Sequence, residues 1–224
     1  MSIRIAHISD THDNPRIVRQ VANCEADIIL ITGDCMATHG RVPDYRSYTH
    51  SHRIDHGVER RYQRSWFRKQ AKKWAPDFKG RPVVAIRGNH DFIGYTKWLE
   101  HYGADVHEIT DATPMVEVLG IRFAGFRQIN HIAGEWTGEE FDLRPFVEKA
   151  LACDPNVLVT HAPPGGILDE GYGISELTTP LFYGEHRITH HFFGHSHYAG
   201  GLVLEEGGIK FVNGAGHCIV HEVG

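Results

Sequence analysis

Polar side chains directly follow an apolar run in the middle of the chain. Residues 83–86 (Val-Val-Ala-Ile) are typical of a strand buried on both faces, and Gly88 ends the run. An amide, an imidazole and a carboxylate come next, at Asn89, His90 and Asp91. Open α/β sheets place their ligands at the carboxyl ends of strands, so this triplet predicts a binding site. Taken alone, it could equally be a polar turn with a hydrogen-bonded histidine.

The same arrangement occurs four more times. Apolar runs at residues 3–9, 27–32, 156–160 and 190–193 end in polar residues, which are Asp10-Thr11-His12, Gly33-Asp34, His161 and Gly194-His195-Ser196-His197. If these five strands are neighbours in the fold, their ends converge on one place. His7, inside the first run, is expected to be a hydrogen-bonded core histidine instead.

Convergence would gather seven oxygen and nitrogen ligands without a thiolate. They are Asp10, His12, Asp34, Asn89, His161, His195 and His197. Such donors suit Mn, Fe, Co or Zn and disfavour soft-metal and iron–sulfur sites. Seven ligands are too many for one open transition-metal ion, but they fit two ions that share a carboxylate. The chain has 18 histidines, and histidine is the commonest metal ligand, so the composition agrees with a metal site.

Length and composition favour one globular domain. With 224 residues and 41% apolar composition, the chain can bury a core as a single domain over residues 1–224, with a helical and loop insertion at about 35–79. No signal-like segment precedes the first strand, and no apolar stretch approaches the roughly 18 residues of a membrane span. We therefore expect a cytoplasmic protein without membrane contact. The net charge of -5 gives no overall basic footprint for duplex nucleic acid.

The cysteines do not form a recognisable framework. They lie far apart and form no CxxC pair, which argues against disulfides and a cysteine zinc site; they are Cys24, Cys35, Cys153 and Cys218. We expect buried thiols. Cys35 stands beside Asp34, where a metal-ligand role is the alternative.

Periodicity and turn residues predict the remaining elements outside the insertion. Pro15 fits the opening of a helix that runs to about Asn23, capped by Asn14 or Asp13. Further helices are expected at residues 95–102 and 141–151. Further strands are expected as a hairpin around Gly120 and as runs that complete the sheet, at residues 115–119, 121–126, 202–205, 209–212 and 218–223.

The insertion at about 35–79 combines a loop with a basic helix. The helix is expected from near Gly57, with an apolar stripe formed by Val58, Tyr62, Trp66, Phe67, Ala71 and Trp74. Its remaining positions are basic, namely Arg60, Arg61, Arg64, Arg68, Lys69, Lys72 and Lys73. A solvated face is the plainer interpretation, and a surface for an anionic substrate or for nucleic acid is the other.

Loop residues provide candidates for substrate binding. If the insertion emerges on the ligand side of the sheet, its Arg side chains could pair with phosphate and its Tyr side chains could stack on a base. The candidates are Arg41, Tyr45, Arg46, Tyr48, His50, His52 and His56, with His131, Arg127 and Trp136 from a later loop. The alternative is that most of them are ordinary loop residues.

The order of the five motifs resembles the calcineurin-like metallophosphoesterase family, whose pattern is D-x-H, G-D, G-N-H-D/E, a lone His and G-H-x-H. The resemblance spans residues 10–197. It implies an α/β (α+β) fold, a four-layer αββα sandwich of two mixed β-sheets flanked by helices, with a dinuclear metal site at the carboxyl ends of strands. It also implies that Asp34 bridges two ions, one held by Asp10, His12, Asp34 and His197 and the other by Asp34, Asn89, His161 and His195.

The resemblance also implies a reaction. In that reaction a hydroxide shared by two divalent ions would attack phosphorus, because two metals lower the pKa of water far below about 15.7. Ions roughly 3.5–4 Å apart can also hold the attacking and equatorial oxygens in line. The ions are expected to be Mn²⁺ or Fe²⁺/Fe³⁺, with Zn²⁺ or Co²⁺ as alternatives. Asp34 and His90 are the implied catalytic residues; His90 assists the leaving group and, with Asn89, contacts the phosphate.

The residues after Asp34 narrow the substrate class. The chain continues as Cys35-Met36-Ala37-Thr38, whereas protein serine/threonine phosphatases continue as V-D-R-G. Residues 157–169 and 192–197 are more similar to small class III cyclic-nucleotide phosphodiesterases and brain metallophosphoesterase-domain proteins. This likeness predicts hydrolysis of a small phosphodiester of about nucleotide size.

Two other functions remain open at this point. A nuclease acting on single-stranded nucleic acid would use the basic helix at residues 60–73. A non-catalytic metal-binding scaffold would resemble the retromer sorting subunit, but such scaffolds can lose the catalytic histidine, whereas His90 is present here.

Overall fold

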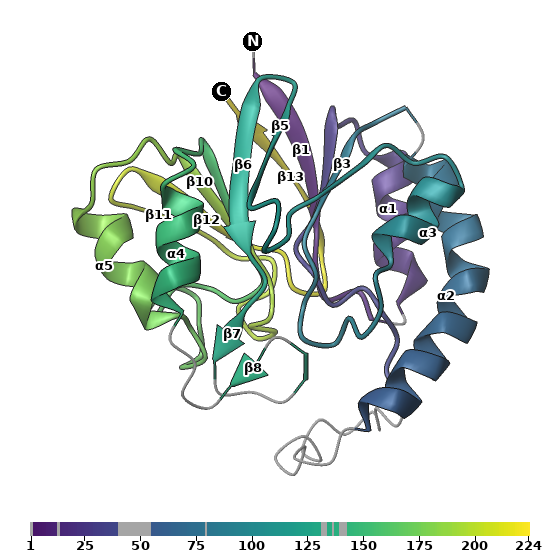
Figure 1. Cartoon of the computed structure of the whole chain (residues 1–224). Coiled ribbons are helices and arrows are strands. Elements are labelled where there is room, and N and C mark those ends of the chain that lie inside the picture. The colour runs from purple at the N-terminus through teal and green to yellow at the C-terminus, as the bar shows by residue number, and fades with distance from the viewer. Residues whose placement is uncertain are drawn as a thin grey trace.

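The fold is a sandwich of two β-sheets with helices on both outer faces (Figure 1). The computed structural model describes residues 2–12, 14–39, 55–78, 80–130, 134–135, 137–138 and 143–224, and of residues 137–138 it describes the backbone alone. The four-layer αββα arrangement of two mixed sheets expected from the motifs is confirmed. Both termini lie at the edge opposite the carboxyl end of β1 (Figure 1).

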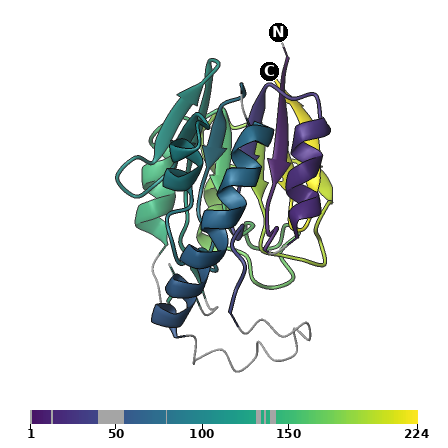
Figure 2. The ribbon, with the colours of Figure 1, turned by 90° about the vertical axis from the view of Figure 1, so that its right-hand side faces the viewer.

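The first sheet is parallel except at one edge. Its strand order is β13-β1-β2-β3-β4, and only the β1–β13 pair is antiparallel. The strands are β13 (Cys218–Val223), β1 (Ile3–Ile8), β2 (Ile28–Ile31), β3 (Val83–Ala85) and β4 (Val106–Glu108). Three helices lie side by side over its outer face (Figure 2): α1 (Pro15–Asn23), α2 (His56–Phe78) and α3 (Thr96–His101).

The second sheet has four parallel strands between two antiparallel edge strands, in the order β11-β12-β10-β9-β6-β5. These are β11 (Val203–Glu206), β12 (Ile209–Asn213), β10 (His190–Phe193), β9 (Val157–Thr160), β6 (Ile121–Phe126) and β5 (Met115–Val118). Two helices cover it, α4 (Arg144–Leu151) and α5 (Ser175–Tyr183). A short parallel pair, β7 (Ile129–Asn130) and β8 (Thr137–Gly138), follows β6.

The continuous apolar runs arise because the central strands are buried on both faces. In β2, Ile29 and Ile31 pack beneath the helices, whereas Ile28 and Leu30 pack between the two sheets. Successive side chains of a strand point to opposite faces, so a strand between two cores needs an apolar residue at every position. This is why the sequence pattern located the strands well.

Several elements differ from the sequence-based expectation, among them the short strands β7 and β8, which lie where a loop was expected. The last strand, β13, was expected to complete the sheet of its predecessors, but it crosses to the first sheet and pairs with β1. The helix α5 and the short strand β4 were not predicted. Pro180 lies inside α5, and proline argues against a helix interior, which hid this element in the sequence.

The buried face of α2 includes polar residues that the predicted apolar stripe left out. Glu59 and Gln63 are 6% and 0% exposed, whereas Val58, Tyr62 and Trp66 are only partly buried. The reason is local, because both polar side chains meet backbone groups of neighbouring loops. The Glu59 carboxylate accepts a hydrogen bond from the backbone N–H of a loop residue at 2.8 Å, and Gln63 contacts the loop after β3.

The prediction of thiols outside disulfides is confirmed for all four cysteines, whereas the prediction that they are buried holds for Cys35 only. All four cysteines are free thiols, and Cys35 is buried. Cys24, Cys153 and Cys218 are partly exposed because they lie at the ends of a helix or strand, where the chain leaves the core.

Three histidines outside the motifs are buried among apolar side chains. His7 lies between the sheets with its Nε2 atom 2.8 Å from Thr32 Oγ1, as the sequence predicted for a core histidine. His191 Nε2 lies 2.8 Å from Thr160 Oγ1. Burial lowers the pKa of His7 and His191 to about 3 and that of His190 to about 4, so all three are neutral in the folded protein near pH 7.

We therefore expect stability to fall steeply in mild acid. The folded pKa values of these histidines lie below the unfolded value of about 6.5, so between about pH 6.5 and pH 4 the unfolded chain binds more protons. Each histidine then removes about 1.4 kcal/mol of unfolding free energy per pH unit. Urea denaturation in a chelating buffer between pH 7 and pH 4.5 measures this slope.

The matched variant is His191→Gln, whose amide nitrogen can keep the bond to Thr160 but cannot titrate. Its slope should be smaller than that of the wild type by about one proton. An unchanged slope would show that His191 is not responsible for this part of the acid sensitivity.

Candidate metal centre

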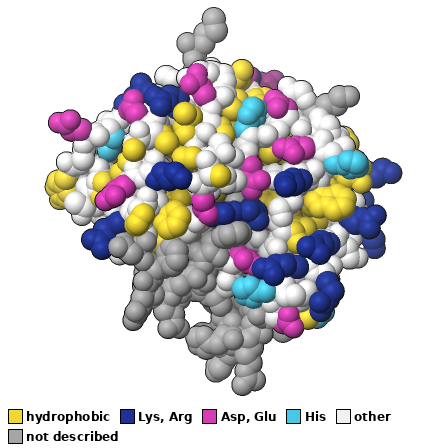
Figure 3. Space-filling view, viewed as in Figure 1, with side chains coloured by type: hydrophobic (Ala, Val, Ile, Leu, Met, Phe, Trp, Pro, Cys, Tyr) yellow, Lys and Arg dark blue, Asp and Glu magenta, His cyan; other side chains and the backbone are white. Residues whose placement is uncertain are grey.

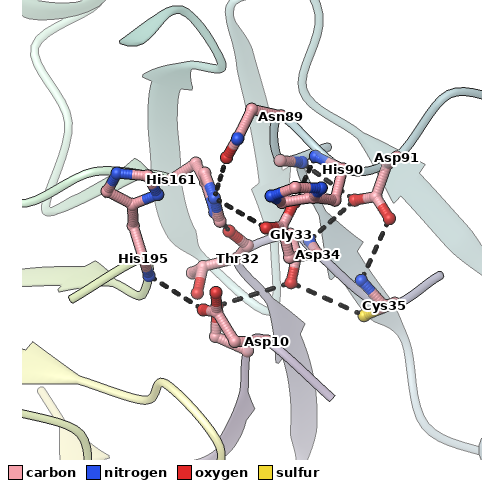
Figure 4. Close-up of polar contacts among 12 residues, drawn as sticks. Asp10, Thr32, Gly33, Asp34, Cys35, Asn89, His90, Asp91, His161 and His195 are labelled. Carbon is pink, nitrogen blue, oxygen red and sulfur yellow. Dashed lines mark hydrogen bonds and ion pairs between the residues drawn. The ribbon is translucent and has the colours of Figure 1, made fainter. Parts of the chain in front are cut away.

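The five polar strand ends meet at one edge of the sandwich. The strands β1, β2 and β3 are neighbours in the first sheet, and β9 and β10 are neighbours in the second. Their carboxyl ends bring Asp10, Asp34, Asn89, His161 and His195 together (Figure 4). The structure thus places in one region the residues that the sequence left scattered.

Asp10 is a buried carboxylate with one oxygen fully engaged and one left for a cation. It is 4% exposed, and its Oδ2 accepts hydrogen bonds from Ser9 Oγ at 2.6 Å and from the His195 backbone N–H at 2.8 Å. Its Oδ1 is buried, lies 3.5 Å from His197 Nε2 and accepts no hydrogen bond from the described residues. A buried carboxylate oxygen in this position is poorly compensated without a bound cation.

Asp34 is a second buried carboxylate of the same edge. It is 1% exposed; Oδ1 accepts a hydrogen bond from the His90 backbone N–H at 2.7 Å, and Oδ2 lies 3.4 Å from His161 Nε2. Burial would raise the pKa of Asp34, but the His161 and His90 side chains hold it well below its usual range. The carboxylate is therefore ionised and depends on neighbouring positive charge.

His161 presents one defined nitrogen to this carboxylate. Its Nδ1 lies 2.8 Å from the Thr32 backbone oxygen, which can only accept, so Nδ1 carries a proton. Its Nε2 lies 3.0 Å from Asn89 Oδ1 and 3.4 Å from Asp34 Oδ2. Burial would lower the pKa of His161, but the Asp34 carboxylate raises it to about 10. The proton on Nε2 therefore lies between this nitrogen and the side-chain oxygens of Asn89 and Asp34. A metal ion could take the place of the proton and bind the same three atoms.

The remaining imidazoles lie around the two carboxylates. The rings of His12 and His197 stack with centroids 5.7 Å apart, and the rings of His161 and His195 meet edge to face at 5.1 Å. His12 is buried, whereas the His197 side chain is about half exposed. One side of the centre is therefore open to solvent.

Two compact groups of side chains have the composition of metal sites. In each group, one ligand atom per residue lies within 4.8 Å of the others; the groups are Asp10, His12 and His197, and Asp10, Asp34 and His161. Asp10 belongs to both groups, whereas the sequence suggested Asp34 as the shared ligand. Oxygen and neutral nitrogen donors without sulfur fit divalent ions such as Mn²⁺, Fe²⁺ or Zn²⁺.

The backbone holds several ligand residues in an uncommon conformation. Asp10, His12, Asp34 and His195 have φ values of 49°, 44°, 51° and 67°. Residues other than glycine seldom adopt this left-handed region, although Asp and His do so more readily than most. Such conformations persist only where surrounding contacts impose them, and they concentrate at functional sites.

The motif glycines make room for the ligands that follow them. A Cβ atom on Gly88 would lie 2.2 Å from Asp34 Oδ1 and 2.7 Å from His161 Cε1. A Cβ atom on Gly194 would lie 1.9 Å from Ser9 Oγ and 2.2 Å from Asp10 Oδ2. Both positions favour glycine because side chains from other strand ends approach the backbone closely, from two strands at Gly88 and from one strand at Gly194.

Asp91 ties two of the ligand loops together. Its carboxylate accepts hydrogen bonds from the backbone N–H groups of Asp34, Cys35, Met36 and Gly88 at 2.8–3.1 Å. Burial and the nearby Asp34 carboxylate raise the pKa of Asp91 to about 7, against the four N–H groups, which favour the ionised form. Asp91 therefore connects the loop after β2 to the loop after β3. The thiol of Cys35 is buried beside it.

Of the loop residues predicted to bind substrate, the structure describes only His56 and Arg127. Arg41, Tyr45, Arg46, Tyr48, His50, His52, His131 and Trp136 lie outside the described residues. His56, at the start of α2, contacts Phe92 edge to face and lies 3.2 Å from Glu135. Arg127 is buried and pairs with Asp111 at 2.7 Å.

Sequence reasoning missed the groups that support the ligands. Ser9 and Thr32 bond the ligand residues, and Gln63 bonds the loop that carries His90. Ser9 and Thr32 each adjoin a motif residue, so their position was a usable signal. For Gln63 the signal was the spacing of four residues to Glu59 and Phe67 on one helix face.

Comparison with known proteins agrees with this geometry. The model of the family described as calcineurin-like phosphoesterase matches residues 3–199. One solved structure aligns with a TM-score of 0.64 at 14% identity, over 95% of this chain and 90% of the other. The protein TT1561 of Thermus thermophilus aligns with a TM-score of 0.58 at 11% identity, over 95% of this chain and 89% of the other. At these identities the structural likeness shows the fold alone.

A third solved structure aligns less well. A conserved uncharacterized protein of Streptococcus pneumoniae TIGR4, described as a predicted phosphoesterase, aligns with a TM-score of only 0.40 at 16% identity, over 95% of this chain and 72% of the other. No curated protein matches the chain significantly. Among the described residues, the helices also lack a segment with the length and apolar character of a membrane span.

We expect divalent ions to stabilise the folded protein through Asp10. Ligand at about 100 times its dissociation constant contributes about 2.7 kcal/mol to a state that alone binds it. For a chain of this size that corresponds to a rise in Tm of roughly 5–10 °C. Calorimetry of chelator-treated protein with and without Mn²⁺ measures the shift, and elemental analysis counts the ions.

In the Asp10→Asn variant the shift should be lost, because the buried Oδ1 no longer carries charge. Glu205→Gln removes an equal charge from an exposed position of β11 and should keep the full shift. Equal shifts in both variants would place the ions elsewhere.

Proposed function

Because this chain belongs to the calcineurin-like phosphoesterase family, we propose that it is a phosphodiesterase that hydrolyses a small phosphodiester at the centre around Asp10 and Asp34. The observation that supports the proposal is the position of His90 beside two buried carboxylates that need a cation. Members of this family typically hold two divalent ions, and this chain has side-chain groups that could hold them.

Bound divalent ions would supply Lewis-acid activation of water and of the phosphoryl oxygens. The chain's own part is to fix the ions and the ester relative to each other. Asp10 and Asp34 provide the negative charge that retains cations, and the imidazoles of His12, His161 and His197 add neutral nitrogen donors. We propose Mn²⁺ or Fe²⁺/Fe³⁺ as the resident ions, since the donors are all oxygen and nitrogen.

We propose that His90 acts on the substrate and does not hold an ion. It is 8% exposed, its ring centroid lies 5.7 Å from that of His12, and neither compact ligand group includes it. Its backbone N–H is fixed by Asp34 Oδ1. An imidazole held at the rim of the centre can donate a proton to the oxygen of the departing alcohol.

We propose a small diester, such as one of nucleotide size, because residues 157–169 and 192–197 are similar to small class III cyclic-nucleotide phosphodiesterases. A diester carries a single negative charge, whereas a monoester near neutral pH carries close to two and is commonly held by Arg or Lys. Comparing the turnover of an aryl diester with that of the matching monoester distinguishes the two substrate classes.

The His90→Asn variant tests the catalytic proposal. General acids contribute on the order of 10²–10⁴-fold, so turnover of a diester with a poor, alkoxide leaving group should fall at least about 100-fold. A nitrophenolate leaves without protonation and should show a much smaller loss. Both assays use protein loaded with Mn²⁺, and elemental analysis should find the wild-type metal content.

The control is His101→Asn, an exposed histidine of α3, which should behave as the wild type. Unchanged turnover in His90→Asn would contradict the role of His90. Wild-type protein that hydrolyses neither diester nor monoester when loaded with Mn²⁺, Fe²⁺, Zn²⁺ or Co²⁺ would contradict the proposed function and favour a binding scaffold.

A second candidate function is a nuclease acting on single-stranded nucleic acid. Lys and Arg side chains gather over α2 in the space-filling view (Figure 3). All seven basic residues of that helix are exposed, in a chain of net charge -5. Two of them have partners, since Arg60 pairs with Glu135 and Arg68 lies over the ring of Trp98. The other five leave a basic stripe that favours a polyanion.

Charge reversal on α2 distinguishes the two candidates. A nuclease should lose binding to a labelled oligothymidylate, measured by anisotropy at low salt, in a triple variant with Arg61→Glu, Arg64→Glu and Lys69→Glu. The same protein should keep its turnover of a small diester. A control with an equal change of charge on the two flanking helices, α1 and α3, carries Arg16→Glu, Arg19→Glu and Lys97→Glu. Wild-type protein that does not bind the oligonucleotide eliminates the nuclease.

A further inference from the structure

The loop that carries His90 is gripped by a buried glutamine of α2. Gln63 is 0% exposed, and its amide makes two hydrogen bonds with the loop backbone. Its Nε2 donates to the His90 carbonyl oxygen at 2.6 Å, and its Oε1 accepts from the Phe92 N–H at 2.9 Å. The side chain therefore bridges the two sides of Asp91, as a neighbouring β-strand would.

The two bonds fix the direction of the His90 main chain. They hold the carbonyl that follows the His90 Cα atom, while Asp34 Oδ1 holds the N–H that precedes it at 2.7 Å. With both flanking peptide groups held, the Cα–Cβ direction of His90 is set, and the ring is aimed before substrate arrives. Without Gln63, the following peptide would keep only the longer bond from its Asp91 N–H to the Gly88 carbonyl oxygen, at 3.2 Å, and its carbonyl would lose its side-chain partner.

The remaining polar groups of this loop are also held. Asp91 accepts four N–H groups from below, and the Asn89 carbonyl accepts the Glu135 N–H at 2.9 Å. The Glu135 side chain in turn pairs with Arg60 of α2. The loop is thus tied on one side to the residues that come after β2, and on the other side to α2.

We propose that Gln63 is a positioning residue that sets the orientation of His90 for transfer of a proton to the leaving oxygen. The proposal rests on the proposed function of His90 as a general acid. It assigns to α2, which lies in a segment outside the five motifs, an indirect share in the reaction. The two hydrogen bonds of the Gln63 amide go to the loop backbone and not to the His90 ring.

A residue that only stabilises the fold would behave differently. Its loss would lower turnover of all esters alike, through less folded or less metal-loaded enzyme. A residue that aims a general acid affects mainly substrates that need protonation of the leaving oxygen. Its effect must also disappear once His90 is absent, since two residues that act through one interaction are not additive.

The test compares Gln63→Leu with Gln70→Leu, a partly exposed glutamine two turns further along α2. Protein loaded with Mn²⁺ is assayed with a series of diesters whose leaving groups range from nitrophenolate to alkoxide. Gln63→Leu should lower turnover of the alkoxide ester about tenfold or more and that of the nitrophenyl ester less than threefold. Gln70→Leu should match the wild type with both.

The same substitution is then made in the His90→Asn background. If Gln63 acts through His90, the double variant should turn over the alkoxide ester as fast as His90→Asn alone, within about twofold. A further tenfold loss in the double variant, or equal losses with every leaving group, would overturn the proposal.

A measurement without turnover keeps the test separate from the proposed function. Hydrogen exchange of the Phe92 amide, followed by NMR in metal-free protein, should speed up about tenfold or more in Gln63→Leu and stay unchanged in Gln70→Leu. Unchanged exchange in Gln63→Leu would show that Gln63 does not hold the loop. If the wild type shows no turnover while Phe92 exchange responds as expected, the catalytic proposal fails and the contact with the loop stands.

Discussion

The centre of this protein depends on keeping two carboxylates, Asp10 and Asp34, ionised inside an apolar sandwich. Burial of a charge costs several kcal/mol unless nearby groups replace the lost water. Here the replacement comes from other strand ends, because Ser9 and His195 donate to Asp10, and His90 donates to Asp34. Apart from Ser9, each donor is a neighbour in space and not in sequence. The carboxylates therefore require the complete sandwich, and a cation at the centre would complete their compensation.

This electrostatic requirement explains the backbone at the strand ends. A carboxylate can receive N–H donors from other loops only if those loops approach closely, and Gly88 and Gly194 allow that approach because they have no side chain. The left-handed conformations of Asp10, Asp34 and His195 occur where each chain leaves its strand, and their side chains gather at one edge of the sandwich (Figure 4). The glycines of the short motifs therefore meet the need for close approach of the loops, and the other motif residues provide the candidate ligands.

The sequence predicted a structural feature well where the local residue pattern alone determines it. It did not predict features that depend on partners far away along the chain. The apolar run of β2 and the glycine–aspartate step after it predicted both a strand and a ligand, because a strand between two cores leaves no other pattern. The edge position of β13 depends on which sheet offers a free partner strand, which its own six residues do not encode. The role of Gln63 was hidden for the same reason, since its partners belong to a loop 27 residues away.

The helix α2 illustrates how a segment outside the motifs can become part of a site. Its inner face is not purely apolar, because Glu59 and Gln63 replace two positions of the expected stripe. Apolar residues there would leave the His90 carbonyl and the Phe92 N–H buried without partners, at a cost of about 1–3 kcal/mol for each group. Glutamine satisfies both with one side chain of matching donor and acceptor geometry. The polar character of this face therefore follows from the loop it covers, and the loop in turn owes its fixed shape to the helix.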